Sequence, residues 1–521
     1  MKMSEQLEKL HRLRARNRAM GGEEKLAKQR ARGKLDVRAR LALLFDEGRF
    51  TEVGLLTNRP GGYEDAADYG PADGVVCGYG PVNGRTVCVA AYDFTVYGGS
   101  MGPHGERKVT RMRELALRNR VPMVWLIDSG GARIRPQEER KPDDLSLFAE
   151  SGYLFREESI MSGVVPLVAA MVGPGAAGTA YIPGLADFVP MVKGTSSIAI
   201  GGPYLTKSTV GEDISEEDLG GSKIHTKISG VADLETRSDQ ECIAAVREYL
   251  GFFPSHCMEK PARAAAVPPP DGAADALRAI LPEETRRAYD MRKLLPWLVD
   301  GGKLFEIKPA WAKNVVCALA RIDGWAVGLV ANNPMYLGGI LDVDSADKAA
   351  RFVNLCDAFQ IPLVFLQDVP GFMVGSKVEQ QGIIRHGAKM IYAVASATVP
   401  KLTVVVRKGY GAGYYAMCGR AYEPDLLVSW PTSEISVMGP EGMVSIFMKK
   451  MLDASPDPEA MKKQVADAIR PYIDPFRVAG QALVDDVIDP AETRAVLAAA
   501  LELTRNKTVE RPPRRREVAP V

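Results

Sequence analysis

Short runs of consecutive apolar residues alternate with amphipathic stretches along most of this chain. The segments VPMVWLI (121–127), VPLVAAMV (165–172) and IPLVFL (361–366) contain no charged residue. Unbroken apolar runs of this length are typical of parallel strands that are buried on both faces of a sheet. The stretches 104–120 and 344–360 instead carry apolar residues at helical spacing. This alternation predicts βαβ units, and therefore an α/β fold with mostly parallel strands.

The ends of the chain and its middle follow other patterns. The first 45 residues have helical apolar spacing and predict one or two helices outside the βαβ units. The Ala- and Pro-rich stretch 260–275 lacks periodicity and divides the 521 residues into halves of similar size. We therefore predict an N-terminal domain over 1–262, a linker over 263–271, a C-terminal domain over 272–510 and a tail over 511–521.

Motifs of the first half return in the same order in the second half. YGG at 97–99 returns as LGG at 337–339, and VPMVWLIDSGG (121–131) returns as IPLVFLQDVPG (361–371), both after 240 residues. The same spacing relates Lys108 to Lys348, Asp128 to Asp368 and Gly131 to Gly371. VPLVAAMV matches VPKLTVVV (399–406) at a spacing of 234. An ordered series of this kind indicates that one fold unit occurs twice.

Composition narrows the class of protein. Hydrophobic residues make up 46% and charged residues 25%, which is typical of a packed globular protein. The net charge of +1 indicates neither a nucleic-acid partner nor a membrane surface. The N-terminus has no apolar signal region, and no apolar stretch is long enough to span a bilayer. The seven scattered cysteines and five histidines show no metal-site spacing. We expect a cytoplasmic protein without a metal.

Two glycine-rich turns are the candidate sites. GPGAAGTAYIPG (173–184) and KGYGAGYYAM (408–417) each follow an apolar strand, and the repeat places Gly178 beside Gly413. Neither segment contains a Cys, His, Asp or Glu side chain for catalysis. Backbone N–H groups at such a strand-to-helix turn can stabilise an oxygen that becomes negative in a transition state. The pair therefore predicts two oxyanion holes that face different ligands.

Other interpretations of these segments compete. Small residues in a turn also serve packing alone. Residues 173–178 match G-x-G-x-x-G, but Pro174 and the lack of an acidic residue about 20 positions later argue against a dinucleotide site. DSGGAR (128–133) is not a nucleophile elbow. EAMKKQ (459–464) is close to a biotin-acceptor motif, but its surroundings predict a capped helix.

With these turns in place, the chain resembles the carboxyltransferase (β) subunit of biotin-dependent acyl-CoA carboxylases of the propionyl-CoA and methylcrotonyl-CoA types. The resemblance extends from about residue 30 to 516. The segments that carry it are DFTVYGGSMG (93–102), LIDSGGARI (126–134), GGPYLTKSTVGEDISEEDLGG (201–221), DVPGFMVG (368–375), the stretch 381–422 and WPTSEISVMG (430–439).

The resemblance implies a fold and roles for the turns. Members have two crotonase-like domains and form oligomers, usually hexamers, with acyl-CoA on the N-terminal domain of one subunit and carboxybiotin on the C-terminal domain of its neighbour. Ala177 and Gly178 match the pair that holds the thioester enolate. Ala412 and Gly413 match the pair that holds the biotin ureido oxygen, and Tyr415 matches a position tied to acyl-group selection. Biotin carboxylase and biotin carboxyl carrier subunits are the implied partners.

Some positions depart from the family pattern. Ala stands at 177 and 412 where Gly occurs in relatives, and its N–H keeps its place only if φ stays negative. Tyr415 replaces the Asp of many propionyl-type members, so either acyl selection or packing in the core explains it. A biotin-dependent decarboxylase subunit, a non-catalytic scaffold and a crotonase-like hydratase are the alternatives. The basic tail at 511–517 is expected to be solvated.

Overall fold

The chain contains two compact units, Met1–Glu259 and Lys260–Val521. The computed structural model describes residues 2–58, 70–133, 153–284, 287–513, 515 and 517–520, which leaves out Ile134 of the motif 126–134 and Arg514 and Arg516 of the tail. Segment 263–271 runs beside the second sheet, where the Ala264 N–H donates to the Gly324 carbonyl at 3.0 Å. The domain limits at 262 and 272 stay predictions.

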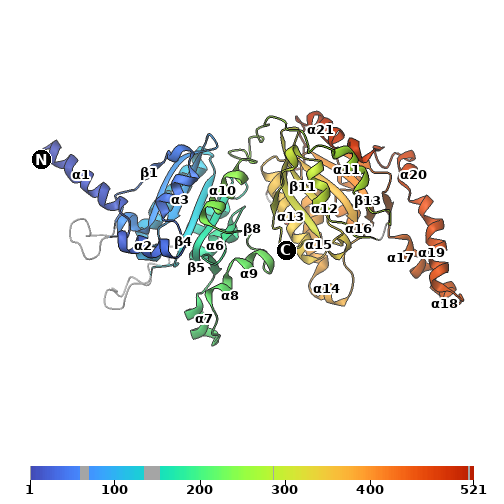
Figure 1. The fold of residues 1–521 in the computed structure, drawn as a ribbon, viewed down its shortest axis with the longest axis horizontal. Coiled ribbons are helices and arrows are strands. Elements are labelled where there is room, and N and C mark those ends of the chain that lie inside the picture. Colours follow the sequence, from blue (N-terminus) through green and yellow to red (C-terminus); the bar gives the residue numbers. More distant parts are fainter. Residues whose placement is uncertain are drawn as a thin grey trace. The chain divides into compact units, whose positions relative to one another are not determined.

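The first unit is built on one eight-stranded sheet (Figure 1). Its strand order is β1-β2-β3-β4-β5-β6-β8, with β7 on β5. Among the described strands of this unit, only β1–β2 and β2–β3 pair antiparallel, and the mostly parallel pairing agrees with the long apolar runs. The strands are β1 (Thr51–Val53), β2 (Val75–Val82), β3 (Arg85–Tyr92), β4 (Met123–Ser129), β5 (Leu167–Ala176), β6 (Pro190–Val192), β7 (Ser197–Ala199) and β8 (Leu234–Thr236).

Helices precede and cover this sheet. The predicted helical extension is confirmed, but the described residues form three helices where one or two were predicted. The third begins where the Asp36 carboxylate accepts the N–H groups of Arg38 and Ala39. The helices of the unit are α1 (Met3–Arg18), α2 (Glu23–Ala31), α3 (Val37–Leu44), α4 (Pro103–Asn119), α5 (Tyr153–Met161), α6 (Gly178–Leu185), α7 (Pro203–Val210), α8 (Glu216–Gly220), α9 (Ser222–Lys227) and α10 (Asp239–Leu250).

The second unit repeats the first sheet strand for strand. Its order is β9-β10-β11-β12-β13-β14-β16, with β15 on β13. The strands are β9 (Phe305–Ile307), β10 (Val315–Ile322), β11 (Trp325–Asn332), β12 (Leu363–Val369), β13 (Lys401–Tyr410), β14 (Leu426–Ser429), β15 (Glu434–Ser436) and β16 (Asp486–Val487). The register is kept as well. Val75 pairs with Tyr92, and the residues 240 positions later, Val315 and Asn332, pair with each other. The predicted internal repeat is confirmed.

Helices also surround the second sheet. EAMKKQ lies inside α19, as predicted, and the Asp457 carboxylate caps that helix by accepting the Ala460 N–H. The helices are α11 (Ala273–Ala279), α12 (Met291–Leu294), α13 (Val343–Ala358), α14 (Ser376–Gln380), α15 (Ile383–Ser396), α16 (Gly411–Ala416), α17 (Pro440–Phe447), α18 (Lys449–Asp453), α19 (Pro458–Ile469), α20 (Pro475–Gly480) and α21 (Thr493–Leu503). Among the described residues, no helix has both the length and the apolar character needed to cross a membrane.

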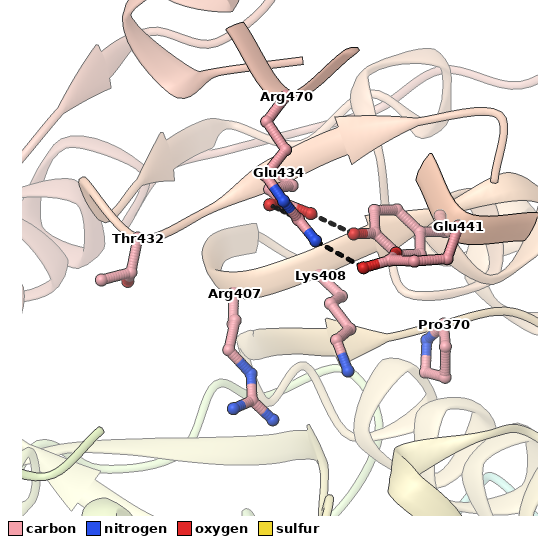
Figure 2. A pocket seen from close by; sticks show the side chains of 8 residues that line it. Pro370, Arg407, Lys408, Thr432, Glu434, Glu441 and Arg470 are labelled. Carbon is pink, nitrogen blue, oxygen red and sulfur yellow. Dashed lines mark hydrogen bonds and ion pairs between the residues drawn. The ribbon is translucent and has the colours of Figure 1, made fainter. Parts of the chain in front are cut away.

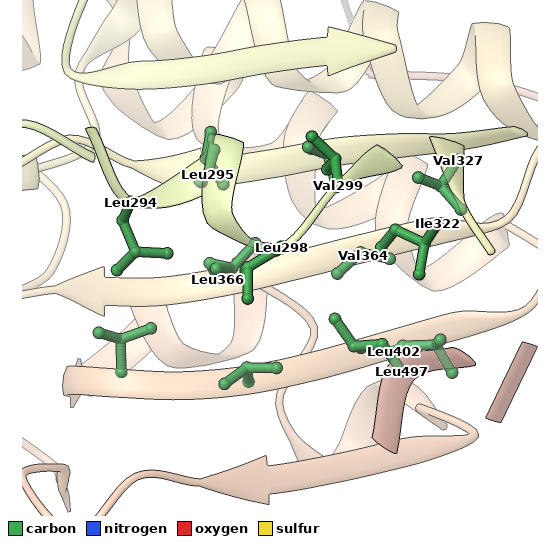
Figure 3. Close-up of a cluster of buried hydrophobic side chains, with 14 of the residues drawn as sticks. Leu294, Leu295, Leu298, Val299, Ile322, Val327, Val364, Leu366, Leu402 and Leu497 are labelled. Carbon is green, nitrogen blue, oxygen red and sulfur yellow. The ribbon is translucent and has the colours of Figure 1, made fainter. Parts of the chain in front are cut away.

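Each unit has its own apolar core against the sheet. In the second unit, Leu294 and Leu298 pack on Val364 and Leu366 of β12 and Leu402 of β13 (Figure 3). Burial of one such side chain contributes roughly 1.5–3 kcal/mol. The first unit has a corresponding cluster on β3, β4 and β5. These cores hold the central strands, whose carboxyl ends carry both glycine-rich turns.

A buried aspartate ends the central strand of each sheet. Asp128 of β4 accepts Arg40 Nη1 at 2.8 Å and Lys34 Nζ at 2.6 Å, and none of the three side chains is more than 7% exposed. Arg40 also donates Nε to Asp239 at 2.7 Å and Nη2 to the Val172 carbonyl at 3.0 Å. The N-terminal helices are therefore fixed to the strand end by ion pairs that are shielded from water.

We predict that Arg40→Met lowers the free energy of unfolding by about 3–5 kcal/mol, because the buried carboxylates of Asp128 and Asp239 both lose their ion pair with the Arg40 guanidinium. Urea denaturation at fixed protein concentration measures the change. Arg49→Met is the matched control, since Arg49 is 62% exposed and only weakly paired with Glu47. Equal denaturation midpoints for the two variants would contradict the prediction.

Candidate functional site

The first glycine-rich turn joins β5 to α6. Ala177 occupies the position before the helix with φ +49° and ψ −120°, a conformation that favours glycine. Its N–H is shared between the carbonyls of Ala199 and Ile200 at 3.3 and 3.2 Å. The condition set from the sequence, a negative φ at Ala177, is therefore not met, because the chain reverses sharply between the buried strand and the helix.

The first residues of α6 present backbone donors. Among the described residues, no acceptor is found for the N–H of Gly178 or Thr179. The Thr179 hydroxyl accepts the Ala176 N–H at 3.0 Å and donates to the Ala176 carbonyl at 2.8 Å, which fixes the turn. Two adjacent N–H groups at a helix N-terminus are suited to binding an oxyanion.

Apolar side chains border this turn. A Cβ atom on Gly178 would lie 2.6 Å from Met101 Cε and 3.7 Å from Phe155 Cζ. The Phe155 ring meets the half-exposed Tyr181 ring edge-on, with centroids 5.4 Å apart. The glycine is therefore needed for access to the backbone, and the apolar border strengthens any hydrogen bond made there.

The second turn joins β13 to α16. Gly411 supplies the positive φ of +54°, so Ala412 keeps the negative φ that the sequence interpretation required. Ala412 is exposed and Gly413 is buried. A Cβ atom on Gly413 would lie 2.7 Å from Val369 Cγ2 and 3.0 Å from Gly371 Cα. In the described part of the chain, the N–H groups of Ala412 and Gly413 have no hydrogen-bond acceptor.

The strand register relates the two turns residue by residue. Ser129 pairs with Gly175 in the first sheet, and Val369 pairs with Gly409 in the second. This register aligns Ala177 with Gly411 and Gly178 with Ala412. The N–H groups without acceptors, at 178–179 and 412–413, are therefore equivalent in the two units. The glycines that the sequence repeat placed side by side, Gly178 and Gly413, are offset by one residue in this register.

A buried aspartate supports the second turn as Asp128 supports the first. Arg407 Nε donates to Asp368 Oδ2 at 2.9 Å, and the Lys408 N–H donates to Oδ1 at 3.3 Å. Burial raises the pKa of Asp368, and Arg407 and Lys408 oppose that rise. These contacts hold the end of β12 against β13, directly before Gly411.

Tyr415 is not a core residue. Its side chain is 47% exposed, and its ring stacks on Tyr422 with centroids 6.3 Å apart. The Tyr414 ring meets it edge-on at 5.8 Å. The packing explanation for Tyr415 is therefore wrong, and an aromatic surface stands beside the exposed Ala412.

A cavity of about 300 Å³ lies in the second unit, at the carboxyl end of β13 (Figure 2). Tyr410 borders it directly before Gly411, and Pro370 borders it directly before Gly371, the glycine that packs against Gly413. The remaining lining residues are charged or polar: Arg407, Lys408, Thr432, Glu434, Glu441 and Arg470. The cavity therefore adjoins both chain segments that form the second turn.

Neither a metal-binding cluster nor an exposed thiol is found at the turns among the described residues. Within the described ranges, no three His, Cys, Asp or Glu side chains are placed to hold a metal ion. All cysteines except Cys257 are buried, and burial raises the pKa of Cys77 and Cys317 to about 12. The donors described at the first turn are backbone N–H groups, and those of the second turn adjoin the charged lining of the cavity.

Sequence reasoning missed several groups around the turns. Lys34, Arg40 and Arg407 neutralise the buried aspartates, and Lys408 borders the cavity. Arg407 and Lys408 directly precede the second turn and were visible as the RK pair of VVVRKGY (404–410). No sequence signal places Lys34 and Arg40, because they lie about 90 residues from Asp128.

Comparison with known proteins gives consistent results. A carboxyl transferase domain model matches residues 28–519. The methylmalonyl-CoA decarboxylase subunit alpha of Veillonella parvula is 40% identical over 514 residues, 98% of each chain. The propionyl-CoA carboxylase beta chain of Roseobacter denitrificans is 39% identical over the full length of both chains.

A solved structure extends the comparison to the fold. The chain is similar to the crystal structure of transcarboxylase 12S, which is described as a hexamer assembly with methylmalonyl-coenzyme A and methylmalonic acid bound. The TM-score is 0.91 at 41% identity, over 100% of this chain and 99% of the other. The predicted fold class, two crotonase-like domains with an N-terminal helical extension, is confirmed.

The two turn alanines are expected to respond to glycine substitution with opposite signs. Ala177→Gly relieves a positive φ whose cost is of order 1–3 kcal/mol, and we expect a net gain in unfolding free energy of about 1 kcal/mol. Ala412→Gly adds chain entropy at a negative φ and is expected to lower it by roughly 0.5–1 kcal/mol. Urea denaturation measures both, and shifts of the same sign would disprove this difference in backbone conformation.

Proposed function

This chain belongs to the carboxyl transferase domain family, and we propose that it transfers a carboxyl group from carboxybiotin to a short or branched acyl-CoA. The enzyme class, a carboxyltransferase of biotin-dependent complexes, follows from the family and its relatives. The observation that carries the finer proposal is the pair of repeat-related turns with open backbone donors. Two anions form in such a transfer, and each turn serves one of them.

The first turn is proposed to hold the thioester oxygen as the acyl group becomes an enolate. The Gly178 N–H is open, and beside it the N–H of the buried Thr179 has no acceptor among the described residues. Ala177 belongs to the proposed site as the residue whose conformation places the Gly178 N–H, because its own N–H donates to the carbonyls of Ala199 and Ile200. One oxyanion donor contributes about 2.7–4 kcal/mol in comparable sites.

The second turn is proposed to hold the ureido oxygen of biotin through the N–H groups of Ala412 and Gly413. Biotin supplies the nitrogen that carries the carboxyl group. The exposed backbone at Ala412 and the adjoining cavity of about 300 Å³ fit a ring of that size. Tyr415, exposed on the next turn of the helix, is the residue that we propose for acyl selection.

Further expectations concern the complex. We propose that biotin carboxylase and biotin carboxyl carrier subunits complete the enzyme, and that the chain forms a homo-oligomer, with a hexamer favoured by the assembly described for transcarboxylase 12S. Cytoplasmic placement is supported by seven cysteines that form no disulfide among the described residues.

The second candidate is a biotin-dependent decarboxylase subunit that runs the transfer in reverse. It is favoured by the Veillonella parvula relative, which is named a methylmalonyl-CoA decarboxylase subunit and is as similar as the carboxylases. The same two turns serve both directions, since a catalyst accelerates a reaction and its reverse alike.

The proposed function predicts biotin-dependent loss of a carboxyl group from an acyl-CoA. We expect the purified chain, given free biotin and malonyl-, methylmalonyl- or methylglutaconyl-CoA, to remove the carboxyl group from one of them. Mass spectrometry of the CoA thioesters measures the loss and identifies the acyl group. A folded oligomer that binds these thioesters but transfers nothing would disprove the proposal.

We predict that Gly178→Val and Gly413→Val each reduce this transfer at least 100-fold, because the added side chain clashes with Met101 or with Val369 and Gly371 and displaces the N–H donors. Gly184→Val is the matched control on the same helix as Gly178: a Cβ atom there meets nothing within 4 Å. Rates with all three variants, alongside their oligomeric state, separate loss of the hole from misfolding. Near-normal turnover in the first two would overturn the assignment of the turns.

A further inference from the structure

The cavity beside the second turn has one wall of paired carboxylates. Arg470 donates to Glu434 and, at 2.6 Å, to Glu441 (Figure 2). The Tyr410 hydroxyl also donates to Glu434. Both carboxylates on this wall therefore already have cationic or hydroxyl donors, and they need no further partner from a ligand.

Arg407 on the other wall is also paired. Its Nε binds Asp368 at 2.9 Å, and its Nη1 donates to the Arg287 carbonyl at 3.0 Å. Its guanidinium lies over the Tyr289 ring, 5.0 Å from the centroid. The guanidinium is thus held in place by the protein and has little freedom to turn toward a ligand.

Lys408 is different. Within the described part of the chain, its Nζ has no hydrogen-bond acceptor within 3.5 Å and no carboxylate within 4.0 Å. Its side chain points away from Glu434 and Glu441 in Figure 2. The residue is only partly exposed, and burial lowers the pKa of its ammonium, whereas Asp368, Glu434 and Glu441 raise it and Arg407 lowers it further.

A partly buried ammonium without a partner is costly, so such groups are normally paired with an anion. Every other charged lining residue of this cavity has a partner within the protein. Lys408 is thus the lining cation that can accept an anion from outside the chain, and a planar carboxylate that accepts more than one of the three N–H bonds suits it best.

The position of the cavity indicates which carboxylate. Lys408 lies three residues before Gly411 on the strand that leads into the second turn, and Tyr410 and Pro370 connect the cavity to both segments of that turn. In a carboxylated ureido ring, the carboxyl group is bonded to the nitrogen next to the ureido carbonyl. A ligand whose ureido oxygen occupies the turn thus carries its carboxylate only a few bonds away.

We propose that Lys408 is the binding residue for a carboxylate-type anion in this cavity, and that the anion is the carboxyl group in transit on the second ligand. The inference rests on the proposed function. When the carboxyl group leaves as carbon dioxide, the N–C bond breaks, its electron pair stays on the ureido group, and Lys408 loses its anionic partner. The negative charge then lies on the oxygen held by Ala412 and Gly413. Free bicarbonate offers the same oxygen geometry and is the other source.

The test uses the full chain with Lys408→Met, Lys408→Arg and, as matched control, Lys463→Met on the exposed surface of α19. The acceptor is biotin amide, because it lacks the carboxylate of free biotin. Transfer from the acyl-CoA that the wild type uses gives kcat and KM, and calorimetry with bicarbonate gives a direct measure of anion binding.

For a carboxyl group bound in transit, we expect Lys408→Met to lower kcat at least about tenfold while KM for biotin amide changes less than about twofold. Lys408→Arg retains the charge and restores part of the rate, and Lys463→Met matches the wild type. If the anion is instead free bicarbonate, we expect the wild type to bind bicarbonate and Lys408→Met not to bind it, while the two proteins transfer the carboxyl group at equal rates. Both results support an anion site at Lys408.

Equal kcat and equal bicarbonate binding in Lys408→Met and the wild type would overturn the inference and leave Lys408 as a solvated lysine. If the wild type transfers no carboxyl group to biotin amide, the proposed function is disproved, whether or not Lys408 binds an anion. Bicarbonate calorimetry then still decides the anion site, and the absence of binding to the wild type would overturn it.

Discussion

A buried carboxylate at the end of the central parallel strand organises each half of this protein. Asp128 and Asp368 are fully buried, and each lies where its strand meets the glycine-rich turn. Such a charge is tolerated only when cations and backbone N–H groups surround it. Gly99 and Gly339 pack against the carbonyls of these same two residues, where a side chain would clash. The strand ends, the adjoining loops and the turns are therefore fixed by one arrangement that occurs twice.

The two units neutralise this carboxylate with cations from different places. In the second unit the cation is Arg407, from the neighbouring strand β13. The equivalent residue in the first unit is Gly173, whose missing side chain leaves room for Lys34 against Asp128. The helices before the repeat are thus part of the support of the first turn, which explains why a repeat protein carries an extension at one end.

The sequence predicted the architecture well because strand spacing records it directly. The repeat, the parallel strands, the N-terminal helices and the two turns could all be predicted from apolar runs and glycines at fixed intervals. The details of the site could not be predicted. The φ of Ala177 depends on carbonyls at 199 and 200, and the partners of Asp128 come from residues about 90 positions away. Whether Lys408 has a partner depends on Arg470 having taken both nearby carboxylates, which only tertiary structure shows.

In the proposed function, one fold unit serves two anions because the two turns share a backbone geometry and differ in the side chains around them. Both turns offer adjacent N–H groups in the same register, so the donor geometry was fixed once and duplicated. Met101 and Phe155 make the first border apolar, which favours an acyl chain and strengthens the bond to an enolate oxygen. The second border is charged: its carboxylates are paired internally, and the Lys408 ammonium has no partner among the residues that the structure describes. In the proposed function, the apolar border of the first turn suits removal of a proton from a carbon atom. The ammonium of Lys408 beside the second turn suits a carboxyl group that is bound as an anion and leaves as neutral carbon dioxide. The division of labour between the units therefore lies in side chains that never enter the turns.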